Sequence, residues 1–462
     1  MLNLPLLVSL FGLVAASGYQ CRGPIELSPP AELSVPVNWP SIWNDSMPPI
    51  PFATQQNCLW EVAVPQGLFA SVVFYRDAPS QIGIWVEYPN GHTEGIDNDD
   101  HSPYIFTSSN FRIHLGKSAI QGSFSFNVVW SKYPNTIHST VQLVKAKGPI
   151  TQRPNSYITT FTADTSVSLV AFSLKNSSEV PLLRQSAVYE GNSTNGRFLG
   201  TLHQVLMSNK AMVSNGNSVT VYTFGLVGFF DYPLLLAEDH SNDVDISFYK
   251  GLNCYSDSLC PMPINAISGS AAVATVDSRT EYIKSIDLLP KGSTLQVYEG
   301  GFGNETLIAS LTNENYANQL PLAVQGSLKQ YLLDSSLITV QLSRDPVDAK
   351  WNTVYDGRIV NIHSFDYGKN SYKQDTVDSF STVKNQKLYF KFKVNNCDFN
   401  GNTTLSISIF RDGNTVFTET YSSQKQPPAF DLKIYGDKMT VNYQNYGRYS
   451  KGFGMGLTTT KN

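Results

Sequence analysis

Two loops rich in acidic side chains are the first candidates for chemistry in this 462-residue chain. The segment IDNDDH contributes Asp97, Asp99, Asp100 and His101, and the segment EDHSNDVD contributes Glu238, Asp239, His240, Asp243 and Asp245. Carboxylate oxygens gathered on a loop are the ligands that Ca²⁺ prefers. Neither segment has the regular Asp spacing and the distal Glu of a dedicated calcium loop. Both are interpreted as solvated turns, and no metal or cofactor is expected.

Motifs for catalysis are missing from the sequence. It has no Gly-x-Ser-x-Gly elbow, no His-Glu-x-x-His pair and no glycine-rich phosphate loop before a helix, and its 7 histidines are scattered. A Ser-His-Asp constellation need not be local in sequence, so a secreted hydrolase with a non-local active site stays open as an alternative. We expect that the chain is not an enzyme.

Tryptophans offer another kind of site, because a flat aromatic ring can stack on a sugar or a peptide. Trp39 and Trp43 lie in a proline-rich segment, whereas Trp60, Trp85 and Trp130 lie in strand-like patterns. The simpler interpretation assigns Trp60, Trp85 and Trp130 to a hydrophobic core and treats Trp39 and Trp43 as a lid packed over it, so that all five are expected to be core residues.

The N-terminus predicts secretion. An apolar run over residues 4–14 is followed by the small residues Ala15, Ala16, Ser17 and Gly18, a pattern typical of a signal peptide over residues 1–18. No later segment is apolar enough for a transmembrane helix, and the polar C-terminus carries no lipid-anchor signal. The mature protein is expected to be soluble and extracellular.

Cysteines and sequons fit an oxidising compartment. Of the 5 cysteines, Cys254 and Cys260 are natural partners, as are Cys21 and Cys58. Cys397 is then left over, either buried and free, which we favour, or bonded to another chain. Asn-x-Ser/Thr sequons, interpreted as sugar acceptors on exposed loops, occur at Asn44, Asn176, Asn192, Asn304 and Asn402.

Composition predicts an all-β chain. Charged residues make up 15% of the sequence, against roughly 25% for an average soluble domain, and 24 Tyr and 25 Phe accompany 32 Gly and 25 Pro. Short strand-like runs recur without a long amphipathic helix, which is typical of sandwiches or barrels. The net charge of −4 leaves no basic surface, so nucleic-acid binding is not expected.

The segment QQNCLWEVAVPQGLFASVVF shows the strand pattern most clearly. Cys58, Trp60, Val62 and Val64 alternate with their neighbours, which predicts a half-buried strand. Pro65-Gln66-Gly67 then interrupts the run before a second apolar stretch, and the pattern predicts a hairpin.

A faint internal repeat predicts several similar units. SAVYEG (186–191) and LQVYEG (295–300) each lead into a sequon, and IWVEYPNG (84–91) and SIFRDGNT (408–415) are weaker echoes. A spacing of roughly 100 residues is the size of one β-sandwich. We therefore predict four β-rich units over residues 19–134, 135–252, 253–366 and 367–462.

The first of these units resembles a known family. Cys21, the proline-rich lead PVNWPSIWNDSMPPIPF, Cys58-Leu59-Trp60, the turn Val64-Pro65-Gln66-Gly67 and FSFNVVW (124–130) resemble the secreted CUB-like domain family expanded in nematodes. The resemblance covers residues 19–134. It implies tandem CUB-like, jelly-roll-like β-sandwiches, the second and third units being diverged copies, and no catalytic activity. The Glu and two Asp that bind Ca²⁺ in many CUB domains have no clear match here.

The resemblance to the CUB-like family also implies a function for this chain. It implies a secreted, glycosylated binding or effector protein in innate immune or stress responses at the gut surface. The implied partner is an extracellular protein or glycan, and association with membrane rafts is implied without a transmembrane anchor. Besides the hydrolase, the alternative is an extracellular structural matrix protein crosslinked through Cys397.

Overall fold

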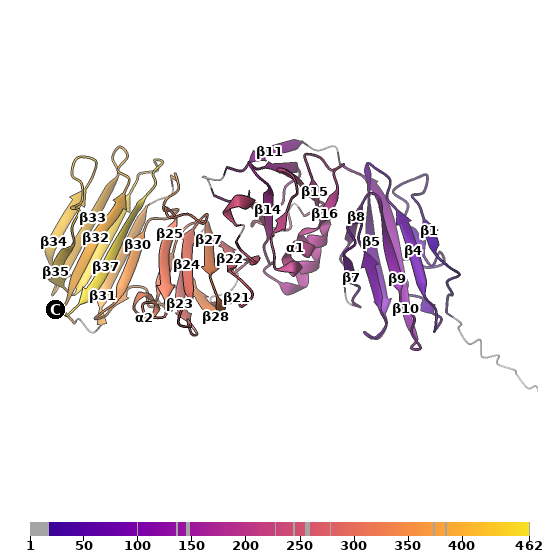
Figure 1. Ribbon diagram of the computed structural model, residues 1–462, viewed down its shortest axis with the longest axis horizontal. Coiled ribbons are helices and arrows are strands. Elements are labelled where there is room, and N and C mark those ends of the chain that lie inside the picture. Colours follow the sequence, from indigo (N-terminus) through magenta and orange to yellow (C-terminus); the bar gives the residue numbers. More distant parts are fainter. Residues whose placement is uncertain are drawn as a thin grey trace, which may run out of the picture. The chain divides into compact units, whose positions relative to one another are not determined.

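The structure, a computed structural model, describes residues 18–98, 100–134, 137–144, 148–226, 228–243, 245–254, 259–277, 279–372, 375–383 and 386–461 (Figure 1). Contacts between residues divide the chain into two compact units, Met1–Asn135 and Thr136–Asn462. Residues 1–17 of the expected signal peptide and Asp99 of the first acidic loop lie outside the described residues.

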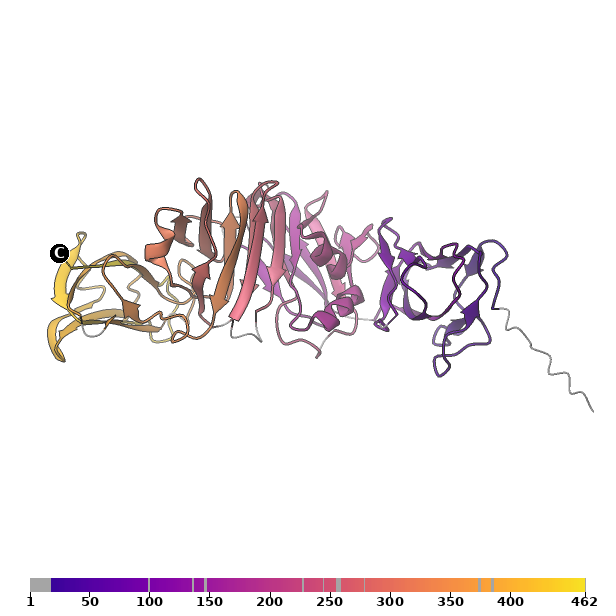
Figure 2. The same ribbon diagram turned by 90° about the horizontal axis from the view of Figure 1, so that it is seen from below.

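The first unit is a β-sandwich, whose two layers face each other in Figure 2 (indigo). Trp60, Val62, Phe74 and Phe126 fill the space between the layers. One sheet has the order β1 (Ile25–Leu27), β4 (Cys58–Ala63), β9 (Asn110–Leu115), β6 (Ile84–Glu87) and β7 (Thr93–Gly95). The other has the order β2 (Val37–Trp39), β10 (Gly122–Lys132), β5 (Leu68–Asp77) and β8 (Tyr104–Thr107), with β3 (Pro51–Phe52) beside β10.

The expected hairpin between β4 and β5 is wrong. Strand β4 is a strand as predicted, with Cys58, Trp60 and Val62 buried. It pairs with β1 and β9, however, whereas β5 pairs with β10 and β8 in the opposite sheet. The turn with Gly67, whose φ is 84°, carries the chain from one layer to the other. Alternation of apolar residues identifies a strand but not its partner.

The second unit contains three further pairs of sheets, taken in chain order. The first pair consists of β11 (His138–Gln142), β13 (Ile158–Thr162), β18 (Ser218–Thr223), β15 (Ser186–Glu190) and β16 (Phe198–Gly200), facing β12 (Ile150–Gln152), β19 (Leu235–Asp239), β14 (Val167–Ala171) and β17 (Met212–Val213). The next consists of β20 (Phe248–Leu252), β22 (Ala271–Val276), β27 (Leu328–Leu333), β24 (Thr294–Glu299) and β25 (Leu307–Thr312), facing β21 (Leu259–Ala266), β28 (Ser336–Ser343), β23 (Glu281–Ile286) and β26 (Leu322–Val324). The last consists of β29 (Thr353–Val354), β31 (Thr376–Thr382), β36 (Lys438–Gln444), β33 (Thr404–Arg411) and β34 (Asn414–Tyr421), facing β30 (Ile359–His363), β37 (Phe453–Thr460), β32 (Leu388–Cys397) and β35 (Leu432–Gly436).

Helices are short and lie between strands. The capping box of Thr201 and Gln204 starts α1, because each side chain bonds the other residue's backbone N–H. In the described part of the chain, the helical segments are α1 (Leu202–Ser208), α2 (Tyr316–Gln319) and the 3₁₀ segments Ser177–Gln185 and His240–Asn242.

One strand order recurs in all four sandwiches. When β3 is set aside as an addition, each five-stranded sheet joins the first, third, eighth, fifth and sixth strands of its sandwich, and the first and third always run parallel. The four similar sequence segments lie on the equivalent strands β6, β15, β24 and β33. The weak sequence repeat therefore reflects a repeated topology.

Strand pairing differs from two of the expected boundaries. A boundary after residue 252 would separate β20 from β22, with which it pairs in parallel. A boundary after residue 366 would separate β29 and β30 from β31 and β37. These first strands of each sandwich are short and carry no sequence signal of their own, so only their pairing assigns them.

Candidate functional site

The five-stranded sheet of the first unit carries a polar and aromatic outer face. In β6, Ile84 and Val86 are buried, so Trp85 and Glu87 lie on the other side of the sheet. In β9, Arg112 and His114 alternate in the same way with buried neighbours. The expectation that Trp85 belongs to the core is wrong. The sequence did carry a signal for this arrangement. Because Ile84 and Val86 are apolar and alternate with Trp85 and Glu87, they predict a buried side of the strand that excludes Trp85.

Charged side chains form a row across this face. The strand registers place Glu61, Arg112 and Glu87 side by side. Arg112 Nε donates to Glu61 Oε1 at 3.0 Å, and its Nη1 donates to Glu87 Oε1 at 3.4 Å. The side chains of Glu61, Arg112 and Glu87 are 36%, 44% and 30% exposed. Such exposed pairs contribute little to stability, and both carboxylates contact Arg112 while they remain partly exposed to solvent.

A second row lies beside the first. His114 Nε2 lies 3.1 Å from Glu87 Oε2. The imidazole of His114 stacks on the indole of Trp85, with ring centroids 4.9 Å apart and planes 5° from parallel. We call the surface made by Glu61, Trp85, Glu87, Arg112 and His114 the outer face of the first unit. It combines an aromatic ring with oriented hydrogen-bonding groups, which is how proteins bind polar ligands.

The first acidic loop fits its interpretation as a solvated turn over its described residues. Asp97 and His101 are exposed, and Asp100 Oδ1 accepts the Ser102 N–H at 3.0 Å.

The second acidic loop is not a solvated turn. Glu238, Asp239 and Asp243 are buried, since they follow the core strand β19. Burial, reinforced by the charge of Asp243, raises the pKa of Glu238 to about 8. Burial also raises the pKa of Asp239, but hydrogen bonds from Thr165 and Ser241 outweigh it and hold that pKa below the usual range. Within the described part of the chain, no group of three or more His, Cys, Asp or Glu side chains is arranged to hold a metal ion.

Ser168 of strand β14 lies beside two residues of this loop, His240 and Asp243. Ser168 Oγ donates to Asp243 Oδ2, and His240 Nδ1 lies 2.7 Å from Asp243 Oδ1. Both groups thus bond to one carboxylate. A hydrolase needs the serine to face the imidazole, which would accept its proton. The contacts between these three residues are not those of a nucleophile and its base.

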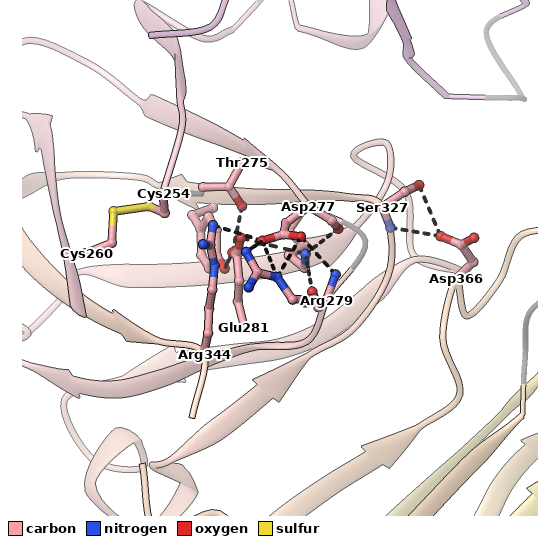
Figure 3. Close-up of polar contacts among 11 residues, drawn as sticks. Cys254, Cys260, Thr275, Asp277, Arg279, Glu281, Ser327, Arg344 and Asp366 are labelled. Atoms are coloured by element: carbon pink, nitrogen blue, oxygen red, sulfur yellow. Dashed lines mark hydrogen bonds and ion pairs between the residues drawn. A yellow bond between two sulfur atoms is a disulfide. The ribbon is translucent and has the colours of Figure 1, made fainter. Parts of the chain in front are cut away.

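A buried ionic cluster lies at one end of the third sandwich (Figure 3). Lys329 and Glu281 are almost fully enclosed and lie 3.7 Å apart, between Nζ and Oε1. Lys329 Nζ also donates to the carbonyl oxygens of Asp277 and Arg279 at 3.0 and 2.9 Å. Arg344 Nη2 lies 2.9 Å from Asp277 Oδ2, and Thr275 Oγ1 donates to Glu281 Oε2 at 2.7 Å. Each buried carboxylate is therefore paired with a cation, Glu281 with Lys329 and Asp277 with Arg344, and we interpret the cluster as structural.

A cavity of about 290 Å³ contains Cys397 in its wall, together with Glu305, Asp398 and Lys451. Cys397 has no disulfide partner and is half-buried. Burial, followed by the charge of Asp398, raises the pKa of its thiol well above the usual range. A thiol is a poor nucleophile when its pKa is raised, because the thiolate is the reactive form.

The remaining predicted site residues lie as follows. Disulfides join Cys21 to Cys58 and Cys254 to Cys260. The sequon asparagines are all exposed, namely Asn44, Asn176, Asn192, Asn304 and Asn402.

The other tryptophans of the first unit pack as expected. Trp43, Trp60 and Trp130 are buried. Trp39 is half-buried, with its ring 5.7 Å from that of Trp60.

Among the described residues, no helix has both the length and the apolar character needed to cross a membrane.

Comparisons with known families agree with the resemblance of the first unit. Residues 16–134 match a family described as a CUB-like domain. Residues 141–224 and 241–345 match two families described as domains of unknown function, DUF7592 and DUF7591. No curated protein matches the chain.

Solved structures with some similarity include two that contain CUB domains. The CUB1-EGF-CUB2 domains of rat MASP-1 are 8% identical, with 45% of this chain and 99% of that chain covered and a TM-score of 0.18. The CUB1-EGF-CUB2 domain of human MASP-1/3 is 12% identical, with 45% and 98% covered and a TM-score of 0.17.

Proposed function

We propose that this chain, whose first unit carries a CUB-like domain, is a secreted, glycosylated and non-catalytic binding protein that recognises an extracellular ligand through the outer face of the first unit. The observation that carries the proposal is the oriented row of Glu61, Arg112 and Glu87 beside Trp85 and His114. Side chains that are half-exposed and already held by neighbours lose little conformational freedom on binding.

Secretion and glycosylation are part of the same proposal. The predicted signal peptide, the two disulfides and the exposed sequon asparagines support them. The resemblance to secreted CUB-like proteins supports a role in innate immune or stress responses at the gut surface, including association with membrane rafts. We further propose that each of the four sandwiches is a separate domain, with boundaries that follow the strand pairing.

The hydrolase alternative is less well supported. It would need a nucleophile within reach of a base, whereas Ser168 and His240 both bond to Asp243 and the thiol of Cys397 has a raised pKa.

A binding assay tests the proposed surface. The full-length secreted chain would be exposed to bacterial cells, gut-surface proteins and immobilised glycans, beside a Glu87→Ala/Arg112→Ala variant. We expect at least a tenfold loss of binding in the variant, because the oriented charges are gone. A matched control is Ser408→Ala/Thr418→Ala, which removes an exposed cross-strand hydroxyl pair (Oγ–Oγ1 2.8 Å) on another sheet. Equal binding by all three proteins would refute the assignment of the surface.

A further inference from the structure

The indole of Trp85 is stacked on His114 on one face, and strand β7 lies on its other side. Across the sheet, Trp85 is paired with His114 on β9 and with Gly95 on β7. The centroid distance of 4.9 Å between Trp85 and His114 matches the spacing of neighbouring strands, about 4.7–4.9 Å. The two rings therefore stand side by side on the sheet. The second face of the indole is directed toward β7, the edge strand, where the paired residue has no side chain.

Space at Gly95 is empty. A Cβ built on Gly95 would meet no heavy atom within 4 Å, and the backbone there is not left-handed. The glycine is thus required neither by its own conformation nor by crowding. Its effect is to leave the space beside the Trp85 ring unfilled, whereas a branched or longer side chain at this cross-strand position would extend beyond the Cβ toward the ring.

Two more glycines accommodate the same ring. A Cβ on Gly83 would lie 3.1 Å from Trp85 Cζ3, and one on Gly116 would lie 3.3 Å from the same atom. Neither residue has a left-handed φ. Their missing side chains therefore make room for the indole itself, and the ring is held between them and His114.

Hydrogen-bonding groups lie on one side of the open ring. Glu87 is two residues from Trp85 on the same strand and hence on the same side of the sheet. Its carboxylate is fixed by Arg112 and His114, yet each oxygen retains capacity to accept another hydrogen bond. An aromatic plate beside an oriented carboxylate is complementary to a ring that has C–H groups on one face and hydroxyls at its rim.

We propose that the open face of Trp85 binds a neutral sugar ring, with hydroxyl groups donating to Glu87; this inference rests on the proposed function of the outer face. Sugar C–H groups carry partial positive charge and are attracted to the negative face of an aromatic ring. A protein partner fits less well. Interface hot spots lie within well-packed, water-excluding surroundings, whereas Trp85 is bordered here by glycines and charged side chains.

A glycan array tests the proposal with the full-length secreted chain. The probes are neutral oligosaccharides of hexoses and N-acetylhexosamines, and any that bind would be titrated in solution. Trp85→Ala should weaken binding at least tenfold, and Trp85→Phe should lose less. Gly95→Val is the sharper variant, because it places a side chain in empty space over the indole without straining the backbone. It should block the sugar while leaving the melting temperature unchanged.

Thr418→Val is the matched control, as Thr418 is exposed on the edge strand β34 of another sheet. Loss of binding in Trp85→Ala and Gly95→Val, but not in Thr418→Val, would support the sugar site. Unchanged binding by Gly95→Val and Trp85→Ala would overturn it. The absence of any neutral oligosaccharide ligand would also overturn the sugar site. If gut-surface proteins still bound in that case, and their binding depended on Glu87 and Arg112, the proposed function would stand without the sugar.

Discussion

His363 Nδ1 lies 3.0 Å from Glu299 Oε1, and both side chains are almost completely buried although they belong to different sandwiches of the second unit. Glu299 ends β24 and His363 ends β30. Tyr367 N–H donates to Glu299 Oε2 at 3.0 Å, and His363 Nε2 lies 3.1 Å from the carbonyl oxygen of Ala323. Burial lowers the pKa of His363, but the contact with Glu299 outweighs it and the net pKa is raised.

Removal of either partner should destabilise the second unit strongly. His363→Ala leaves the carboxylate of Glu299 buried without its cation, and the loss of one partner of a buried pair costs about 3–5 kcal/mol. The free energy of unfolding in urea would measure this. His101→Ala, which removes an exposed histidine of the first unit, is the control and should leave the second unit unchanged. A cost below about 1 kcal/mol, as for surface pairs, would contradict the assigned contact.

The stability of the second unit should fall as pH rises toward 8. Burial raises the pKa of Glu238 to about 8, whereas the unfolded chain has an ordinary glutamate pKa of about 4.3. The folded state thus binds the proton more tightly. Its contribution is complete below about pH 4.3 and is lost as pH rises to about 8, on the order of a few kcal/mol.

Glu238→Gln should flatten this part of the profile, because the amide does not titrate. Melting temperatures between pH 5 and 9 would show it, with Glu314→Gln at an exposed position as the control. A variant with the same slope as the wild-type protein would rule out Glu238 as the source.

Lys329→Met should destabilise the second unit by about 3–5 kcal/mol, since it leaves Glu281 buried without a cation. Lys284→Met is a matched control. Lys284 pairs with Asp348 at 2.7 Å, but the side chains are 35% and 37% exposed, so a change of about 0–1 kcal/mol is expected. Chemical denaturation of both variants gives the comparison, and equal effects would contradict a structural role for the buried cluster.

Loss of the Cys21–Cys58 disulfide should destabilise the first unit. The bond closes a loop with a sequence separation of 37, for which the chain-entropy argument gives about 3–4 kcal/mol. Cys21→Ser/Cys58→Ser should therefore unfold at lower denaturant concentration, followed by the fluorescence of the buried tryptophans. Cys397→Ser is the control, since Cys397 has no disulfide partner. An unchanged transition of the first unit would refute this role.

Much of the fold was predictable because strands leave a local pattern. The alternation over β4 identified a strand with Cys58, Trp60 and Val62 inside, and the echoes around Tyr189-Glu190 and Tyr298-Glu299 identified equivalent strands. The same alternation, applied to Ile84 and Val86, would have placed Trp85 outside the core. Glu87 and Glu299 both end the equivalent strand of their sandwich, yet the side chain of Glu87 is partly exposed to solvent whereas that of Glu299 is buried.

Composition and the alternation of apolar residues were enough to predict the all-β class, and similar segments at regular spacing predicted the repeated sandwich, because these signals lie within short segments of the chain. Tertiary structure alone decided that β4 does not pair with β5, that Glu238 is buried, and that Glu299 meets His363. It also decided that Gly83 and Gly116 lie against the indole of Trp85, with Gly95 as its partner across the sheet. The physical reason is that strand pairing and burial depend on contacts between distant segments, which leave no periodic signal in the segments themselves.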